Sequence, residues 1–182
     1  HLKKNKINFV YKKAIKKQIN KLKKYRLLKD NGIIEYPEYG FKELSLICKK
    51  IRELNGGVLF IDYGYDIKKN INTVQSVVKH RFNKIDKNIG NADITSLVNF
   101  NLYKEYFDMN NLNVEKIISQ SEFLQKMGII ERVKIAENKM SSLERSDLHL
   151  RIKRLIHPQM MGKNFKVLFA KNKKCSFSLA FK

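Results

Sequence analysis

Apolar residues recur at three- and four-residue steps along much of this chain, and that spacing is typical of helices with one apolar face. In residues 1–30 the apolar stripe lies among lysines, which predicts a basic amphipathic helix ending at the Asn-Gly pair near residue 32. A capping-box pattern at 119–122 marks a later helix start, and Asp93 or Thr95 is a candidate cap for the helix before it. The helical stripes fall in five places: 7–22, 41–51, 98–106, 123–127 and 148–156.

Residues 58–61 form a continuous apolar run without alternation, which is the pattern of a strand buried on both faces of a parallel sheet. A helical stripe leads into this run through a glycine pair, and that order indicates an α/β fold. Residues 70–90 are polar and irregular, so they predict a long surface excursion of the kind that carries function. Near the C-terminus, residues 165–169 and 176–181 predict the two strands of a terminal antiparallel hairpin.

The length of 182 residues suits one domain with a loose amino-terminal arm. No apolar run approaches the ~20 residues of a membrane span, and no secretory signal is expected. The chain opens at His1 rather than at a methionine, so we expect the true start to lie upstream. Cys48 and Cys175 lack metal-ligand spacing and are expected to be packing residues in a reducing cytoplasm. No metal site is expected, at these residues or at His149 and His157.

The net charge of +21 has two explanations. A strongly basic chain is typical of proteins that bind an anionic partner such as nucleic acid or a membrane surface. Lysine vastly outnumbers arginine, however, and isoleucine and asparagine are abundant, which is the bias expected when codons drift toward A and T. The basic stretch has no aromatic interleaving beyond Tyr11 and Tyr25, so a nucleic-acid partner is not favoured.

Four segments of the chain carry distinctive motifs: residues 56–65, 73–100, 120–129 and 161–167. In order, they hold a strand ending in DYG, a T-[LV]-Q…H-R-F pattern continued by G-x-A-D-[IL]-T-x-x-V-x-F, a Q-x-x-F-L-x-x-[LM]-G-I pattern and an M-G-x-x-F-K-V pattern. The same motifs occur in the same order in MidA-type S-adenosylmethionine-dependent methyltransferases, so from about residue 33 to about residue 170 the chain resembles that family. Glu35 stands where the family has an acidic residue before the intervening helix.

The resemblance implies a class I methyltransferase fold, in which a Gly-rich turn after an early strand approaches S-adenosylmethionine. No such turn precedes Gly56, since Gly32 and Gly40 are isolated. We therefore expect residues 31–182 to be the C-terminal part of a methyltransferase-like domain: an incomplete Rossmann-like α/β sheet with a helical cap insertion at 66–140 and the C-terminal antiparallel hairpin. The cofactor site then lies largely outside this chain, and no cofactor-binding residue is assigned.

The candidate site residues lie at the end of the apolar strand and in the polar excursion. Asp62 lies at the carboxyl end of the strand, where open α/β sheets bind ligands, although it can instead cap the next turn. His80 and Arg81 are suited to acceptor recognition, although a loop fixed by hydrogen bonds is the alternative. The expected catalytic residues are Asp62, Tyr63, His80 and Arg81, and the expected substrate-binding residues are Tyr65, Gln75, Asp93 and Gln120.

The resemblance also implies a function. The complete enzyme would methylate a protein arginine in connection with assembly of respiratory complex I, in the bacterial cytoplasm or, for some relatives, in the mitochondrial matrix. This chain alone is expected to be inactive and to need a second chain that supplies the N-terminal half, or to self-associate. Two other readings stay open: a non-catalytic remnant that binds a protein partner, and a basic binder of nucleic acid or membrane surfaces, whose affinity would fall steeply with salt.

Overall fold

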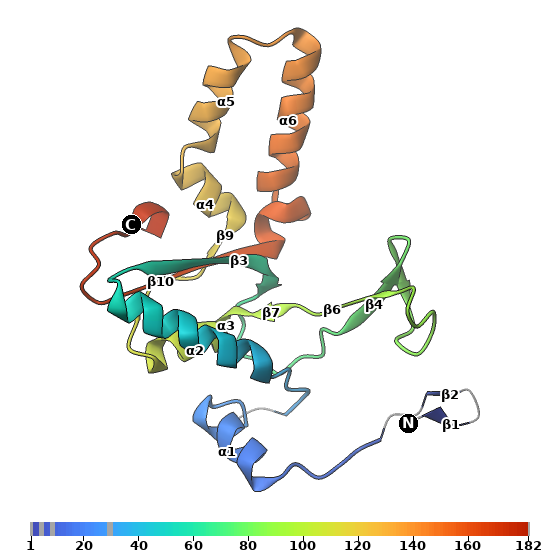
Figure 1. Cartoon of the computed structure of the whole chain (residues 1–182). Coiled ribbons are helices and arrows are strands. Elements are labelled where there is room, and N and C mark those ends of the chain that lie inside the picture. The colour runs from blue at the N-terminus through green and yellow to red at the C-terminus, as the bar shows by residue number, and fades with distance from the viewer. Residues whose placement is uncertain (1, 4–5, 8–9, 29–30, 182) are drawn as a thin grey trace. The chain divides into compact units, whose positions relative to one another are not determined.

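The computed structural model describes residues 2–3, 6–7, 10–28 and 31–181, and the chain divides into two compact units (Figure 1). The first unit comprises His1–Tyr36 and Lys68–Leu97, and the second comprises Pro37–Ile67 and Val98–Lys182. Among the described helices, none is long and apolar enough to cross a membrane.

The second unit is built on a mixed sheet in which β3 and β10 run antiparallel over seven residue pairs, from Gly57 opposite Lys171 to Tyr63 opposite Phe165. The short β7 runs parallel to the last two residues of β3, and β8 and β9 both pair with β10. An α/β fold was predicted and is confirmed. The strands are β3 (Gly57–Tyr65), β7 (Val98–Asn99), β8 (Asn113–Val114), β9 (Ile118–Ser119) and β10 (Phe165–Lys171).

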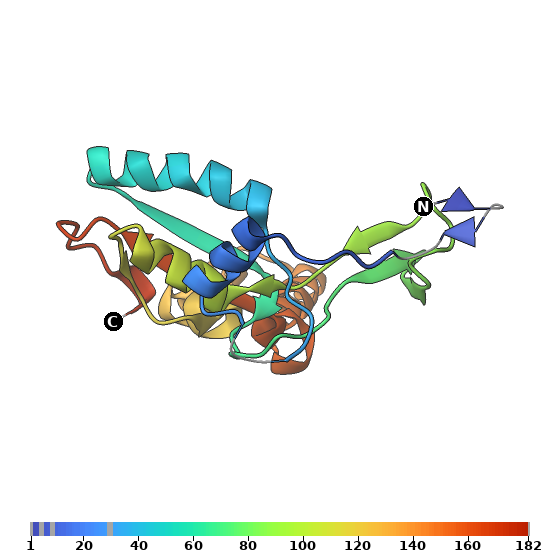
Figure 2. The same cartoon turned by 90° about the horizontal axis from the view of Figure 1, so that it is seen from below.

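Two helices, α2 (Glu38–Glu53) and α3 (Phe100–Met109), form the core on one side of this sheet. Phe60 of β3 contacts the rings of Tyr103 and Phe107 of α3, and Phe41 of α2 stacks on Tyr106 of α3 with ring centroids 4.2 Å apart. The Tyr106 hydroxyl also donates to the Phe41 carbonyl oxygen at 2.7 Å. Figure 2 shows α2 and β3 side by side and running in opposite directions. The predicted stripe of α2 is confirmed at four buried positions: Phe41, Leu44, Cys48 and Ile51.

The start of α3 corrects one prediction. Asn99 caps this helix, since its side-chain oxygen accepts a hydrogen bond from the Leu102 amide. Asp93 and Thr95, which were candidate caps, lie in a strand instead. Aspartate and threonine both favour helix starts, but threonine also favours strands. Here pairing with β4 decides for the strand.

The opposite face of the sheet is only partly covered. Val167 of β10 is fully buried in a cluster with Ile118, Phe123 and Ala180. On β3, however, Leu59 and Ile61 are each 45% exposed. The prediction that residues 58–61 are buried on both faces is therefore wrong for this chain, because the described elements cover β10 on this side but not β3.

Helices α4 (Gln120–Lys126), α5 (Ile129–Glu137) and α6 (Ser142–Ile156) follow in the second unit, and the short η1 (Pro158–Gly162) leads into β10. The Ser119 hydroxyl accepts the Glu122 amide at 3.1 Å, which confirms the predicted helix start at Ser119, while the Glu122 side chain pairs with Lys126 instead of completing the capping box. Gly128 has a φ of +78° and turns the chain between α4 and α5. Helix α6 ends before Pro158, as predicted.

The predicted second strand at 176–181 is wrong. After β10 the chain turns and ends in the short 3-10 helix η2 (Leu179–Phe181). The reason lies in Lys171, whose buried ammonium donates to the Phe177 carbonyl oxygen at 2.6 Å and to the Ser178 hydroxyl at 3.0 Å. Those bonds draw the returning segment across the end of β10. The antiparallel partner of β10 is β3, about 100 residues earlier in the sequence.

The first unit contains short elements, and they differ from the prediction in two places. The basic helix expected over residues 1–30 covers only Lys16–Lys24, and a pair of antiparallel strands precedes it; part of the predicted helix lies outside the described residues. Residues 70–90, expected to be irregular, hold a hairpin that joins a third strand. The elements are β1 (Leu2–Lys3), β2 (Lys6–Ile7), α1 (Lys16–Lys24), β4 (Gln75–Val78), β5 (Arg81–Asn83) and β6 (Asp93–Thr95).

Candidate functional site

The carboxyl end of β3 is shaped by Gly64. A Cβ atom at this position would lie 2.3 Å from the Val98 carbonyl oxygen and 2.8 Å from the Phe100 ring. Any side chain would therefore push β7 away from β3. The glycine of the DYG segment is needed because it lets the second parallel strand reach β3 beside the candidate residues Asp62, Tyr63 and Tyr65.

Asp62 lies within β3, three residues before the strand ends at Tyr65, and its Oδ1 accepts the amide of the next residue, Tyr63, at 2.7 Å. Its charge also reaches α3: burial, and secondarily the negative charge of Asp62, raises the pKa of Tyr103. Tyr63 is 40% exposed, and its ring centroid lies 5.7 Å from that of Phe165. The turn that Asp62 was expected to cap as its alternative role is absent, since residues 63–65 continue β3. Asp62 is exposed, so it can contact a ligand.

Two further polar residues belong to this strand end and were missed from the sequence. Lys166 lies directly opposite Asp62 on β10, and its Nζ is 3.7 Å from Oδ1 of Asp66, with only 14% of the lysine side chain exposed. The Asn101 side chain donates to the Asp66 carbonyl oxygen and fixes the turn after β3. The F-K-V segment pointed to Lys166, but its position depends on an antiparallel register that no local pattern reveals.

Asp62, Lys166 and Asp66 form a polar site that carries both negative and positive charge. Carboxylates at Asp62 and Asp66 can accept charge-assisted hydrogen bonds from a cationic acceptor, and a carboxylate can also accept a proton. The half-buried Lys166 ammonium pairs with the Asp66 carboxylate and fixes its position. The arrangement is suited to positioning a basic group at the end of the sheet.

Gln120 lies elsewhere in the second unit. Its side chain is buried, and its Nε2 donates to the Leu155 carbonyl oxygen at 2.9 Å, which joins α4 to α6. The structure gives this residue a helix-bridging role, and substrate binding by Gln120 stays a prediction.

In the first unit, Glu35 joins distant parts of the chain. Its carboxylate accepts the Thr73 amide at 2.7 Å, the Thr73 hydroxyl at 2.5 Å and the Val74 amide at 3.1 Å. The Thr73 hydroxyl oxygen in turn accepts the Leu97 amide at 2.9 Å. Glu35 and the threonine of the T-V-Q segment therefore act together as the fastening point of the β4–β6 excursion.

The excursion places its candidate residues on different sides of a small sheet. Gln75 lies opposite Thr95, and Val77 lies opposite both Phe82 and Asp93, so alternation puts Gln75, Phe82 and Asp93 on one face. Arg81 lies opposite Val78 and falls on the other face. His80 occupies the hairpin turn with a φ of +63° and is exposed. The excursion does not gather His80 and Arg81 with Gln75 and Asp93 on one face, and the roles predicted for all four stay predictions.

The described residues do not fit S-adenosylmethionine by themselves. Gly32, at φ +128°, uses its freedom to approach Asn70, since a Cβ would lie 2.2 Å from that residue's carbonyl oxygen. Gly40 lies inside α2 rather than in a polar turn. Neither glycine follows a strand, so neither forms the turn by which the backbone of this fold class approaches its cofactor.

A sheet with a parallel strand pair, an antiparallel last strand and helices packed on it defines a mixed α/β protein. Solved structures share this fold. One is an uncharacterised protein from Burkholderia thailandensis, and the match covers 85% of this chain and 43% of that protein, with 20% identity and a TM-score of 0.69. Another is a protein from the same bacterium bound to S-adenosyl-homocysteine, and the match covers 75% of this chain and 38% of that protein, with 20% identity and a TM-score of 0.57. The predicted methyltransferase-like fold is confirmed.

The sequence comparisons identify the family. Residues 1–118 match the model of a family described as S-adenosyl-L-methionine-dependent methyltransferases, and the chain belongs to that family. It is 28% identical over 119 residues to the mitochondrial protein arginine methyltransferase NDUFAF7 of Danio rerio and 27% identical over 125 residues to that of Xenopus tropicalis. These matches cover 65% and 68% of this chain and 28% of each relative.

Proposed function

We propose that this chain forms the acceptor-binding side of an S-adenosylmethionine-dependent methyltransferase. The observation that carries the proposal is the site near the end of β3, where Asp62 lies opposite Lys166 and the Lys166 ammonium meets the Asp66 carboxylate. The family membership supplies the reaction class. The chain's own residues bind and orient the acceptor, and a carboxylate there accommodates the proton that the acceptor loses.

The acceptor we propose is a protein arginine. The curated relatives are named protein arginine methyltransferases, and carboxylates such as those of Asp62 and Asp66 suit a guanidinium, which donates in a planar fork. From the family resemblance of the four sequence segments we also propose a link to assembly of respiratory complex I and, for this chain, a cytoplasmic location. Tyr63 and Tyr65 alternate to the other face of β3 from Asp62, and we propose that they contact the acceptor from that side.

The cofactor-binding half is proposed to come from polypeptide outside the described sequence, either a second chain or further sequence of the same protein. Two features support this. No described strand pairs with β3 on the edge away from β10 before Gly64, and the face carrying Leu59 and Ile61 is exposed. The chain spans about 28% of the length of its curated relatives. We therefore expect residues 1–182 alone to bind S-adenosylmethionine weakly or not at all, as measured by calorimetry.

The test of the function is methyl transfer by the complete enzyme, assembled from this chain and a Gly-rich half. Asp62→Asn should lower transfer to an arginine-containing protein by about 10²-fold, in the range typical for a proton-handling group, while changing cofactor affinity little. Asp147→Asn is the matched control, because Asp147 forms an exposed pair with Arg151 on α6. Equal losses of transfer and of cofactor affinity in Asp62→Asn would place this residue at the cofactor and contradict the proposal.

A further inference from the structure

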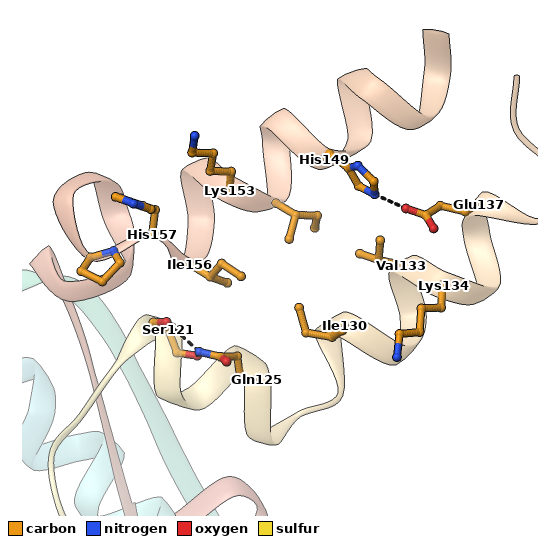
Figure 3. Close-up of a pocket in the computed structure, with 12 residues that line it drawn as sticks. Ser121, Gln125, Ile130, Val133, Lys134, Glu137, His149, Lys153, Ile156 and His157 are labelled. Carbon is orange, nitrogen blue, oxygen red and sulfur yellow. Dashed lines mark hydrogen bonds and ion pairs between the residues drawn. The ribbon is translucent and has the colours of Figure 1, made fainter. Parts of the chain in front are cut away.

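Helices α5 and α6 leave a cleft between them, with α4 at one end. Neither α5 nor α6 buries a single residue fully, although both belong to the second unit. The cleft has a volume of about 620 Å³, and Figure 3 shows side chains from both helices converging on it. Helices with an apolar stripe normally bury it against another element, but among the described residues α4 covers this pair only at one end and leaves the rest of its apolar side chains partly exposed.

The walls of the cleft are branched aliphatic side chains. Ile130 and Val133 face inward from α5, and Ile152 and Ile156 contribute from α6. Each pair is spaced three or four residues apart, so each helix presents one narrow apolar ridge along the cleft. A third helix with its own apolar ridge can pack between two such ridges.

The far end of the cleft is fixed by a polar contact between the two helices. The ring nitrogen Nε2 of His149 on α6 meets Oε1 of Glu137 on α5 (Figure 3). At the near end the Gln125 side chain donates to the Ser121 hydroxyl at 2.9 Å within α4. The His149–Glu137 contact therefore links α5 to α6 at the far end, while the Gln125–Ser121 bond orients a side chain of α4 at the near end.

The rims of the cleft carry two lysines, Lys153 on α6 and Lys134 on α5, while the Glu137 carboxylate of the lining meets His149. His149 and Lys153 lie four residues apart on α6, which is about 6 Å along the helix axis. Within the described part of the chain, neither lysine forms an ion pair. Carboxylates repeated every fourth residue on an apposed helix match the spacing of the α6 rim.

We propose that this cleft binds an amphipathic α-helix of a partner protein, with its apolar stripe between the two ridges and acidic residues against the rims. Charge complementarity selects this occupant over a second copy of the chain. Two copies facing each other would bring basic rims together, and the net charge of +21 adds to that repulsion. The mode is helix-in-groove recognition, and it does not depend on the proposed methyl transfer.

The test uses three synthetic peptides of about 18 residues, long enough for five helical turns. One has a leucine stripe flanked by glutamates, one has lysines in place of the glutamates, and one has the acidic composition in shuffled order. Fluorescence anisotropy with the full chain should show that the acidic amphipathic peptide binds about tenfold more tightly than either of the others. Equal binding of the shuffled peptide would reduce the result to nonspecific attraction by a basic protein and overturn the proposal.

Variants then locate the binding. Val133→Glu and Ile152→Glu should each weaken binding about tenfold, and Lys153→Glu, which leaves the ridges intact, should shift the preference toward the lysine peptide. The matched controls are Ile135→Glu, at a 71% exposed position of α5, and Lys139→Glu, outside the cleft lining. Losses in the controls as large as those in the cleft variants would overturn the proposal. So would sedimentation showing that Ile152→Glu dissolves a dimer, since the occupant would then be a second copy.

Discussion

Tyr25 is the residue whose chemistry the fold alters most clearly. It is buried at the end of α1, with its ring centroid 5.8 Å from that of Tyr36. Burial chiefly, and the neighbouring Tyr36, raise the pKa of Tyr25 from 10 to about 12. The folded chain therefore keeps a phenol proton that the unfolded chain releases between pH 10 and about 12.

This difference predicts a loss of stability in that window. As pH rises above 10, the unfolding free energy should fall, by at most about 1.4 kcal/mol per pH unit for one group. Tyr25→Phe should remove this part of the slope, and denaturant titrations at several pH values between 9 and 11.5 would measure it. Tyr11→Phe, at a 96% exposed tyrosine, should leave the slope unchanged. An identical slope in wild type and Tyr25→Phe would contradict the prediction.

At the residue scale, Asp62 and Tyr63 drew attention because both follow an apolar run directly, but the strand continues through them to Tyr65, and their roles stay predictions. The sequence did not reveal Lys166, whose neighbours Asp62 and Asp66 lie about 100 residues away and depend on the register of β3 with β10. It also misassigned Asp93 as a cap. Local preference supports a cap and a strand about equally there, and only pairing with Val77 decides between them.

At the element scale, Lys171 decides how the chain ends. Only 4% of its side chain is exposed, and its ammonium meets Glu115 at 2.8 Å in addition to its bonds to Phe177 and Ser178. Phe177 and Phe181 both place their rings about 6 Å from that of Phe169 on β10. The segment is thus anchored by one buried cation and by ring contacts rather than by a strand ladder.

Lys171→Met should therefore release the C-terminal segment. The substitution leaves the Glu115 carboxylate and the Phe177 carbonyl without their partner, and breaking a buried pair in this way costs about 3 kcal/mol. Urea unfolding would measure the loss, and faster hydrogen exchange confined to residues 175–181 would locate it. Lys174→Met, at an exposed lysine of the preceding turn, is the control. Similar losses in the two variants would show that the buried cation is not the anchor.

Helices were easier to predict than strands in this chain. The stripes of α2, α4 and α6, the start at Ser119 and the stop before Pro158 follow from spacing and from single residues. The strands β4, β5 and β6 lie in sequence too polar to suggest pairing, because their small sheet leaves all of β6 and most of β5 exposed and needs no apolar alternation. Residues 176–181 alternate with the period of a strand, but no edge of β10 is free to pair with them. β10 pairs with β3 on one side and with β8 and β9 on the other.

At the scale of the whole molecule, the exposed face and edge of β3 favour association. Leu59 and Ile61 present apolar surface beside an edge that no described strand pairs with before Gly64. The high positive charge opposes contact between copies, and salt screens that repulsion. We expect sedimentation of residues 1–182 to show association that grows with protein concentration and with salt.

Ile61→Lys should weaken this association about tenfold, because it places a charge in the contact, while Ile135→Lys on α5 should not. A monomer at all concentrations, with one sharp melting transition, would show instead that the chain covers its own edge. The α/β class and its methyltransferase character followed from the sequence, through the order of the four segments. The exposure of Leu59 and Ile61 on β3 did not follow from the sequence. An apolar run predicts that a strand is buried, but it does not say which polypeptide buries it.

The fastening of the excursion at Thr73 has a consequence for how this chain can change. Thr73 and Leu97 are joined by a hydrogen bond, and Glu35 holds the same threonine, so residues 74–96 form a loop whose two ends are tied at one point. The entropy of closing a loop grows slowly with its length, by about 0.6 kcal/mol for each doubling. Descendants of this sequence could therefore lengthen, shorten or exchange the loop at little thermodynamic expense, provided that the glutamate and the threonine at its base were retained.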